Sequence, residues 1–153
     1  NYYPCYSEPM SQGTRCRQLA EYVVFESPLN MLCDSPTNYD REEECTEFIA
    51  AIPTVWEQTI AMSGEIGKCI TMARRKGDVW YVGSLTNWDA RTLTLDLSFL
   101  GAGRWKAEMF HDGVNANRLA SDYQKTVTDI PASRKLTVKM AQGGGCALKI
   151  YKE

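Results

Sequence analysis

The chain has 153 residues, of which 44% are hydrophobic and 24% charged, a composition typical of a folded globular protein and unlike that of a disordered one. Its net charge of -2 arises from 17 basic and 19 acidic residues spread along the sequence, which leaves no basic stripe for a nucleic-acid backbone or an anionic membrane. No segment approaches the roughly 20 apolar residues that cross a bilayer. These features argue against a nucleic-acid partner and against a membrane span.

The cysteines lie within apolar patterns and show neither the close spacings of a disulfide scaffold nor a CxxC motif. His111 is the single histidine, which nearly excludes the usual zinc sites built from cysteine and histidine. We therefore expect buried free thiols at Cys5, Cys16, Cys33, Cys45, Cys69 and Cys146.

The first predicted element is a helix over residues 16–27. Apolar residues recur there at the spacing of a helix with one buried face, and Pro28 ends the pattern. Residues 29–33 follow as a short run with almost no polar face, which is typical of a strand covered on both sides in a parallel sheet. The sequence thus predicts a helix and then a buried strand.

A second helix is predicted from Asp40 to Pro53, after a loop over residues 34–39. Asp40 and Glu43 have the spacing of a capping box, with Asp in place of the usual Ser or Thr. The order helix, buried strand, helix is typical of an α/β barrel or a doubly wound sheet. The inner face of this second helix would consist of Cys45, Phe48, Ile49 and Ile52.

From residue 54 onward the apolar residues alternate with polar ones, which is the period of a half-buried strand. Turn sequences such as Asp112-Gly113 separate the runs, so the pattern predicts an antiparallel sandwich. About eight strands are predicted, over residues 54–62, 68–74, 79–85, 91–97, 104–110, 125–130, 135–140 and 146–151.

A lone strand of the parallel type cannot pair within an antiparallel sandwich, and two helices cannot bury their apolar faces alone. We therefore interpret residues 1–53 as the final part of an α/β unit whose other strands are not in this sequence, and residues 54–153 as a β-sandwich domain. The first residue is Asn1 rather than Met, which agrees with a piece of a longer protein.

Several blocks of sequence carry a family resemblance. They are PMSQGTRCRQLAEYVVFESPLNMLCDSPTNY, FIAAIPTVWEQTIAMSGEIG, ARRKGDVWYVGSLTNWDARTLTLDLSFL, and FHDGVNAN followed by DY and a late GGG. In this order they resemble the C-terminal part of glycoside hydrolase family 97, from about Pro9 to near the end of the chain.

The resemblance implies a fold, an activity and a location. Members of that family have an N-terminal β-sandwich, a central (β/α)8 barrel and a C-terminal β domain. The expected fold class is therefore mainly β, with a C-terminal antiparallel β-sandwich preceded by the last helix, strand and helix of the barrel. The expected parent is a calcium-dependent, exo-acting α-glycosidase of the periplasm or the cell exterior, with α-galactosidase placed ahead of α-glucosidase.

The family's catalytic carboxylates and calcium ligands lie on earlier segments, so the resemblance assigns no catalytic residue and no metal ligand to this chain. We expect the chain to be inactive alone and to need the N-terminal and barrel domains to act on an oligosaccharide. Without them, residues 16–33 would favour self-association unless they fold back on the sandwich, because they would expose Leu19, Val23, Leu29 and Leu32.

Barrel geometry predicts which residues would face the substrate, since the loops after barrel strands open on the active face. Residues 1–15 and 34–39 would lie on that face, whereas Glu26 would lie near the opposite one. Aromatic rings and carboxylates suit a pyranose, so sugar contacts are predicted for Tyr3, Glu8, Gln12 and Asp34. In the alternative interpretation, Asp34 makes turn hydrogen bonds and the tyrosines pack on the barrel rim.

A second class of function is a stand-alone carbohydrate-binding β-sandwich module, in which exposed aromatic rings stack on sugars. Trp80 and Tyr81 are adjacent and would face opposite ways, so at most one of them could join a surface platform. Trp88, in the sequence TNWD, is the best candidate for sugar stacking.

The remaining motifs are interpreted as structural. His111 has no nearby nucleophile and would stand at a strand end, while residues 74–78 would form a charged hairpin turn. Glutamates 42–44 would occupy the first turn of a helix, where the helix dipole favours negative charge. Residues 143–145 lack the lysine of a phosphate-binding loop and would form a wide connection.

Overall fold

The computed structural model describes residues 12–32 and 34–153. Within this part, helices α1 (Arg15–Val24), α2 (Pro36–Arg41) and α3 (Glu43–Ala51) precede eight strands. Each strand overlaps one of the predicted runs, which confirms the antiparallel β prediction. The strands are β1 (Gln58–Glu65), β2 (Cys69–Lys76), β3 (Val79–Thr86), β4 (Arg91–Asp96), β5 (Trp105–Asp112), β6 (Tyr123–Asp129), β7 (Lys135–Met140) and β8 (Gly145–Lys152).

The strands form two sheets. Six of them pair in the order β1-β2-β3-β8-β5-β6, and β4 pairs with β7 in a separate two-stranded sheet. Every pair is antiparallel, and the last strand, β8, lies in the middle of the large sheet between β3 and β5. A core that includes Val82, Leu95, Trp105 and Val138 joins the two sheets, as expected for a sandwich.

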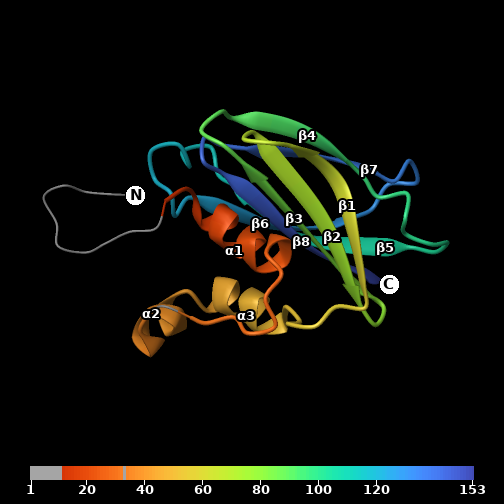
Figure 1. The fold of residues 1–153 in the computed structure, drawn as a ribbon, viewed down its shortest axis with the longest axis horizontal. Coiled ribbons are helices and arrows are strands. Elements are labelled where there is room, and N and C mark those ends of the chain that lie inside the picture. Colours follow the sequence, from red (N-terminus) through yellow and green to blue (C-terminus); the bar gives the residue numbers. More distant parts are fainter. Residues whose placement is uncertain (1–11, 33) are drawn as a thin grey trace, which may run out of the picture.

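The helices cover the other face of the six-stranded sheet, so the molecule has three layers (Figure 1). A second core lies there and includes Leu19 and Val23 of α1 and Phe48 of α3. Trp80 and Tyr81 are adjacent on β3 and belong to different cores, Trp80 to the one between the sheets and Tyr81 to the one under the helices. The predicted opposite orientation of these two rings is confirmed.

Helix α1 lies very close to the backbone of the large sheet. A Cβ atom on Gly83 of β3 would be 2.8 Å from the carbonyl oxygen of Ala20 and 3.0 Å from Cβ of Val23. A Cβ atom on Gly145 of β8 would be 2.8 Å from Cα of Arg17. Glycine at these two neighbouring positions therefore lets the helix settle onto the sheet.

The buried strand predicted over residues 29–33 is not formed. Its described part, residues 29–32, has no regular secondary structure, and Leu29 and Leu32 are 74% and 50% exposed. A strand of the parallel type needs neighbours for its backbone groups, and each described strand pairs in one of the two antiparallel sheets. Leu19 and Val23, by contrast, are buried because α1 folds back on the sandwich.

The predicted loop and helix cap are also wrong. Helix α2 begins at Pro36, inside the predicted loop, and Asp40 lies within this helix rather than at the start of the next one. The residue that precedes α3 is Glu42, and its side chain makes no capping hydrogen bond. Pro36 fixes a backbone angle that suits the first helical turn, which favours the extra helix.

The cysteines agree with the prediction of free thiols in the part of the chain that the structure covers. Cys69 is half-buried, and burial raises the pKa of the Cys146 thiol to about 12. A thiol with so high a pKa reacts slowly at neutral pH. Cys16, Cys45 and Cys146 are buried, and Cys5 and Cys33 lie outside the described residues.

Replacing Gly83 by alanine should destabilise the chain by about 1–3 kcal/mol, because the added methyl group forces α1 away from the sheet. The matched control is Gly101→Ala, where no atom lies within 4 Å of the new Cβ. Urea unfolding measures both. An unfolding free energy for Gly83→Ala equal to that of the control would show that the close approach of α1 contributes no stability.

Candidate functional site

Trp88 is the most exposed tryptophan of the described chain and lies in the loop between β3 and β4. Its side chain is seated on Gly143, since a Cβ atom on that glycine would be 2.8 Å from Cζ3 and 3.0 Å from Cε3 of the indole. Gly143 has a φ of +62°, which also favours glycine. With 64% of the residue exposed, the indole has one side against backbone and the rest open to solvent.

The glycine loop, residues 143–145, joins the Trp88 loop to the start of α1. The N–H of Gly143 donates to the carbonyl of Asn87 at 2.8 Å, and the carbonyl of Gly143 accepts from the N–H of Thr14 at 3.1 Å. The N–H of Thr86 donates to Gly144. This segment is a compact junction of three chain segments rather than the wide connection that we expected.

Asp112, at the end of β5, accepts hydrogen bonds from backbone groups of this junction. It is the one buried carboxylate among the described residues. Its Oδ2 accepts from the N–H of Ala141 at 2.8 Å and from the N–H of Gly145 at 3.2 Å. Burial raises the pKa of Asp112, and hydrogen bonds from Thr14, Ala141 and Gly145 oppose that rise.

Two of the four predicted substrate contacts, Tyr3 and Glu8, lie outside the described residues. Gln12 is exposed and lies two residues before Thr14, so the structure brings it to the same end of the molecule as Trp88. The backbone carbonyl of Gln12 accepts a hydrogen bond from Nε2 of Gln18 at 3.1 Å, and the side chain of Gln12 takes no part in this bond.

Asp34 belongs to a local turn. Its Oδ1 accepts from the N–H of Ser35 and from Nδ2 of Asn38, both at 2.7 Å. The bond from Asn38, and then that from Ser35, lowers the pKa of Asp34. None of these hydrogen-bond partners lies at the end of the molecule that carries Trp88. The structure therefore does not place Asp34 in one site with Trp88, and the predicted sugar contact of Asp34 stays a prediction.

Arg74 was predicted both as the last residue of the strand over residues 68–74 and as the first residue of the charged turn, and the structure places it in the strand. The hairpin turn consists of Gly77 and Asp78 alone, and Arg74 is 2% exposed within β2. Its Nη2 donates to the carbonyl of Val24 at 3.0 Å, at the end of α1, and its guanidinium lies 5.8 Å from the ring of Trp56. A cation at this position suits the negative end of the α1 dipole.

His111, predicted at a strand end, lies near the end of β5, and its Nδ1 is 3.2 Å from the carbonyl oxygen of Asp112. The buried role of Asp112 was missed because Asp112 stands beside Gly113 in a turn sequence, and that of Arg74 because Arg74 begins the charged run of residues 74–78. The predicted strand over residues 68–74 already included Arg74, but the alternation of apolar residues could not show its contact with α1.

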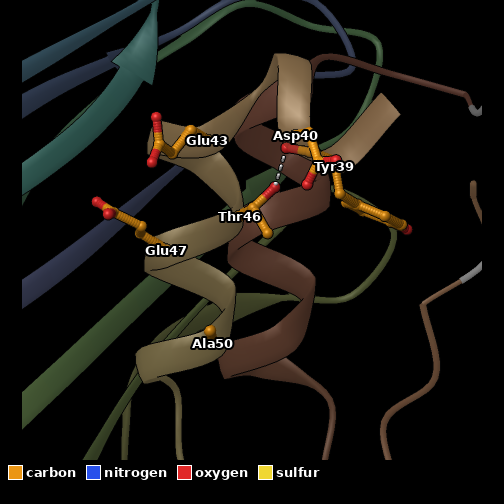
Figure 2. A pocket seen from close by; sticks show the side chains of 6 residues that line it. All are labelled: Tyr39, Asp40, Glu43, Thr46, Glu47 and Ala50. Carbon is orange, nitrogen blue, oxygen red and sulfur yellow. Dashed lines mark hydrogen bonds between the residues drawn. The ribbon is translucent and has the colours of Figure 1, made fainter. Parts of the chain in front are cut away.

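A surface hollow of about 420 Å³ lies on the outer side of α2 and α3 (Figure 2). Its lining includes Asp40, Glu43 and Glu47, and Oγ1 of Thr46 donates to the carbonyl of Tyr39 across it at 3.0 Å. These carboxylates are exposed, and no buried polar group points into the hollow from the described residues. Such an open, acidic depression lacks the apolar enclosure of a sugar site.

The calcium ion that the resemblance implies has no matching ligand set in the described residues. No group of three or more His, Cys, Asp or Glu side chains able to hold a metal occurs within residues 12–32 and 34–153. Calcium prefers six to eight oxygen ligands, which this part of the chain does not gather.

Comparison with known families gives a direct match. The family model described as "Glycosyl-hydrolase 97 C-terminal, oligomerisation" matches residues 55–151. The chain belongs to glycoside hydrolase family 97. The resemblance that the sequence blocks indicated is confirmed, and the chain corresponds to the C-terminal part of the family.

Two curated relatives of the chain are α-galactosidases by name. The chain is 62% identical over 150 residues to a retaining alpha-galactosidase of Bacteroides thetaiotaomicron, a match that covers 98% of this chain and 23% of that protein. It is 29% identical over 96 residues to a probable retaining alpha-galactosidase of Streptomyces bingchenggensis, covering 63% of this chain and 15% of that protein. The chain thus spans a quarter or less of the length of these relatives.

Solved structures agree. A family 97 enzyme from Pseudoalteromonas sp. strain K8 in complex with acarbose superimposes with a TM-score of 0.87 at 39% identity, over 92% of this chain and 23% of that one. A beta-arabinopyranosidase superimposes with a TM-score of 0.76 at 26% identity, over 90% of this chain and 21% of that one. The three-layer arrangement of helices and sheets therefore occurs within much longer enzymes.

The raised pKa of Asp112 predicts a specific pH dependence of stability. Its ordinary pKa is near 3.8, so between that value and its higher folded pKa the folded chain binds the proton better than the unfolded chain does. The Asp112 contribution to the unfolding free energy should therefore fall as the pH rises through this window. Asp112→Asn should remove that slope and keep an oxygen for the N–H groups of Ala141 and Gly145.

Urea unfolding of the wild type, Asp112→Asn and Asp112→Ala across pH 4 to 7 tests the prediction. Asp112→Ala should cost about 1–3 kcal/mol at every pH, since two buried N–H groups lose their acceptor. Parallel pH curves for the wild type and Asp112→Asn would contradict the assigned titration.

Proposed function

We propose that this chain is the C-terminal part of a retaining, exo-acting α-galactosidase. The observation that carries the proposal is the 62% identity with a retaining alpha-galactosidase over 98% of the chain. An α-glucoside is the alternative substrate, since a family 97 enzyme variant forms a complex with panose, an oligosaccharide of glucose. In either case the substrate would be a terminal α-linked sugar of an oligosaccharide.

The chain itself would carry no catalytic group. A retaining glycosidase needs two carboxyl groups about 5–5.5 Å apart, one to protonate the leaving oxygen and one to attack the sugar. Asp112 is the one buried carboxylate of the described part, and its Oδ2 is occupied by two backbone N–H groups. The catalytic pair would therefore belong to the rest of the longer protein.

The structural role of the chain would be to close and buttress a catalytic barrel. In this proposal residues 1–53 form the end of a (β/α)8 barrel and residues 54–153 form the domain that follows it. Phe25, Leu29 and Leu32 support the proposal, because they form an exposed apolar segment directly after α1, where a barrel strand would be covered. Without that cover, the same segment would favour self-association of the chain.

Calcium and location complete the proposal. A calcium ion, if the longer enzyme uses one, would be held by residues outside the described part of this chain. Periplasmic or secreted placement follows from the family resemblance, and none of the described helices is long and apolar enough to cross a membrane.

A stand-alone saccharide-binding module is the alternative function, and the exposed ring of Trp88 favours it. The two proposals differ in where activity resides. The module would bind a saccharide and be complete without a catalytic partner, whereas the glycosidase would need the longer protein.

Activity measurements separate the two proposals. The 153-residue chain should give no turnover of an aryl α-galactoside or aryl α-glucoside, with or without calcium. The longer protein should hydrolyse the aryl α-galactoside faster than the aryl α-glucoside. Nuclear magnetic resonance of the first product should show retained configuration at the anomeric carbon. Turnover by the chain alone would overturn the placement of the catalytic groups, and no turnover by the longer protein would overturn the proposed activity.

A further inference from the structure

The surroundings of Trp88 lie away from the surface that a barrel would cover. The Trp88 loop leads from β3 in the large sheet to β4 in the small sheet, and β4 lies on the side of the large sheet opposite the helices (Figure 1). The exposed apolar residues Phe25, Leu29 and Leu32 follow the C-terminal end of α1 instead. A barrel docked on those residues leaves the Trp88 ring accessible.

The glycine loop sets the position of Trp88 along the axis of such a barrel. The carbonyl of Gly143 accepts from the N–H of Thr14, the residue that caps α1, and Gly143 also seats the Trp88 ring. In a (β/α)8 barrel each helix begins near the active face, because the loop before it opens there. Trp88 thus stands level with the active face, at its periphery.

The ring is held in place rather than free to collapse onto the surface. Gly143 fills the space below it, and the loop that carries it is closed by hydrogen bonds of Asn87, whose carbonyl accepts from Gly143 and whose Oδ1 accepts from the N–H of Asp89 at 3.0 Å. Two exposed polar residues are its neighbours in the chain, since Asp89 directly follows Trp88 and Gln142 directly precedes Gly143. Oδ2 of Asp89 accepts from Nδ2 of Asn87 at 3.2 Å, which adds a further hydrogen bond within the loop. A rigid, exposed aromatic face suits the apolar face of a pyranose ring.

We propose that Trp88 forms an outer saccharide-binding position that holds sugar units of the substrate remote from the bond that is cut. The proposal rests on the proposed glycosidase function of the longer protein. Because the ring lies at the periphery, it would contact only substrates long enough to reach it, and a substrate with a single sugar would not touch it. Trp88 would thereby favour long oligosaccharides over short ones.

The test compares Trp88→Ala, Trp88→Phe and the wild type in the longer enzyme, with aryl α-galactoside and with α-galactosyl-terminated oligosaccharides of increasing length. Trp88→Ala should raise KM about twofold to tenfold for the longest substrate, which is the effect of one aromatic contact, and leave kcat and the aryl substrate unchanged. Trp88→Phe should restore most of the affinity. The aryl α-galactoside, which is too short to reach the ring, serves as the matched control for each variant.

An equal change in KM for short and long substrates would mean that the substitution acts through the fold of the loop. No change in KM for any substrate would mean that the ring contacts no sugar. Either result overturns the proposal. Titration of the 153-residue chain with the longest oligosaccharide, followed by tryptophan fluorescence, gives a readout that needs no activity. A signal that is lost in Trp88→Ala supports the saccharide position even where the longer protein fails to hydrolyse galactosides, and no signal in the wild type counts against it.

Discussion

The contact on which the rest of the structure depends is the seat of α1 on the six-stranded sheet. Gly83 and Gly145 lie on the adjacent central strands β3 and β8, and each leaves room for the backbone of the helix where a methyl group would collide with it. The helix brings Leu19 and Val23 into a core that the sheet alone would leave open. Its burial converts a two-sheet sandwich into a three-layer unit with both faces of the large sheet covered.

Each end of α1 makes a further contact with the sandwich. At the start of α1, Thr14 joins the glycine loop, which Asp112 holds and which carries the ring of Trp88. At its end, Arg74 reaches from β2 to the carbonyl of Val24, and the apolar segment that follows is exposed. One end therefore presents the proposed saccharide position, and the other presents the surface proposed to meet the barrel.

The parts of the fold that the sequence predicts well are those governed by local periodicity. Eight alternating runs become eight strands, and the buried stripe of α1 includes Leu19 and Val23 as its spacing indicates. The segment 29–33 fails as a strand because burial of an apolar run depends on partners, and the described part of it has no strand beside it. The capping box fails because Pro36 starts a helix early and moves Asp40 into its interior.

The candidate site was only partly predictable, because its support depends on contacts between residues far apart in the chain. Trp88 could be singled out as an aromatic residue in a turn sequence, and its exposure agrees with that choice. Its seat on Gly143, the link to Thr14 and the buried carboxylate of Asp112 join residues far apart in the chain, and no local pattern encodes such contacts. Sequence reasoning therefore found the ring but missed its support.

We infer that α1 and the sandwich form one cooperative unit, although the helix belongs to the part of the chain assigned to a barrel. Hydrogen exchange of the backbone amides measures this most directly, by comparing residues 19–24 of α1 with residues 82–85 of β3 under native conditions. We expect protection of the helix within about tenfold of that of the strand, since both would open only by global unfolding. Exchange of the helix more than about a hundredfold faster than that of the strand would contradict it, because α1 would then detach while the sheet stays folded.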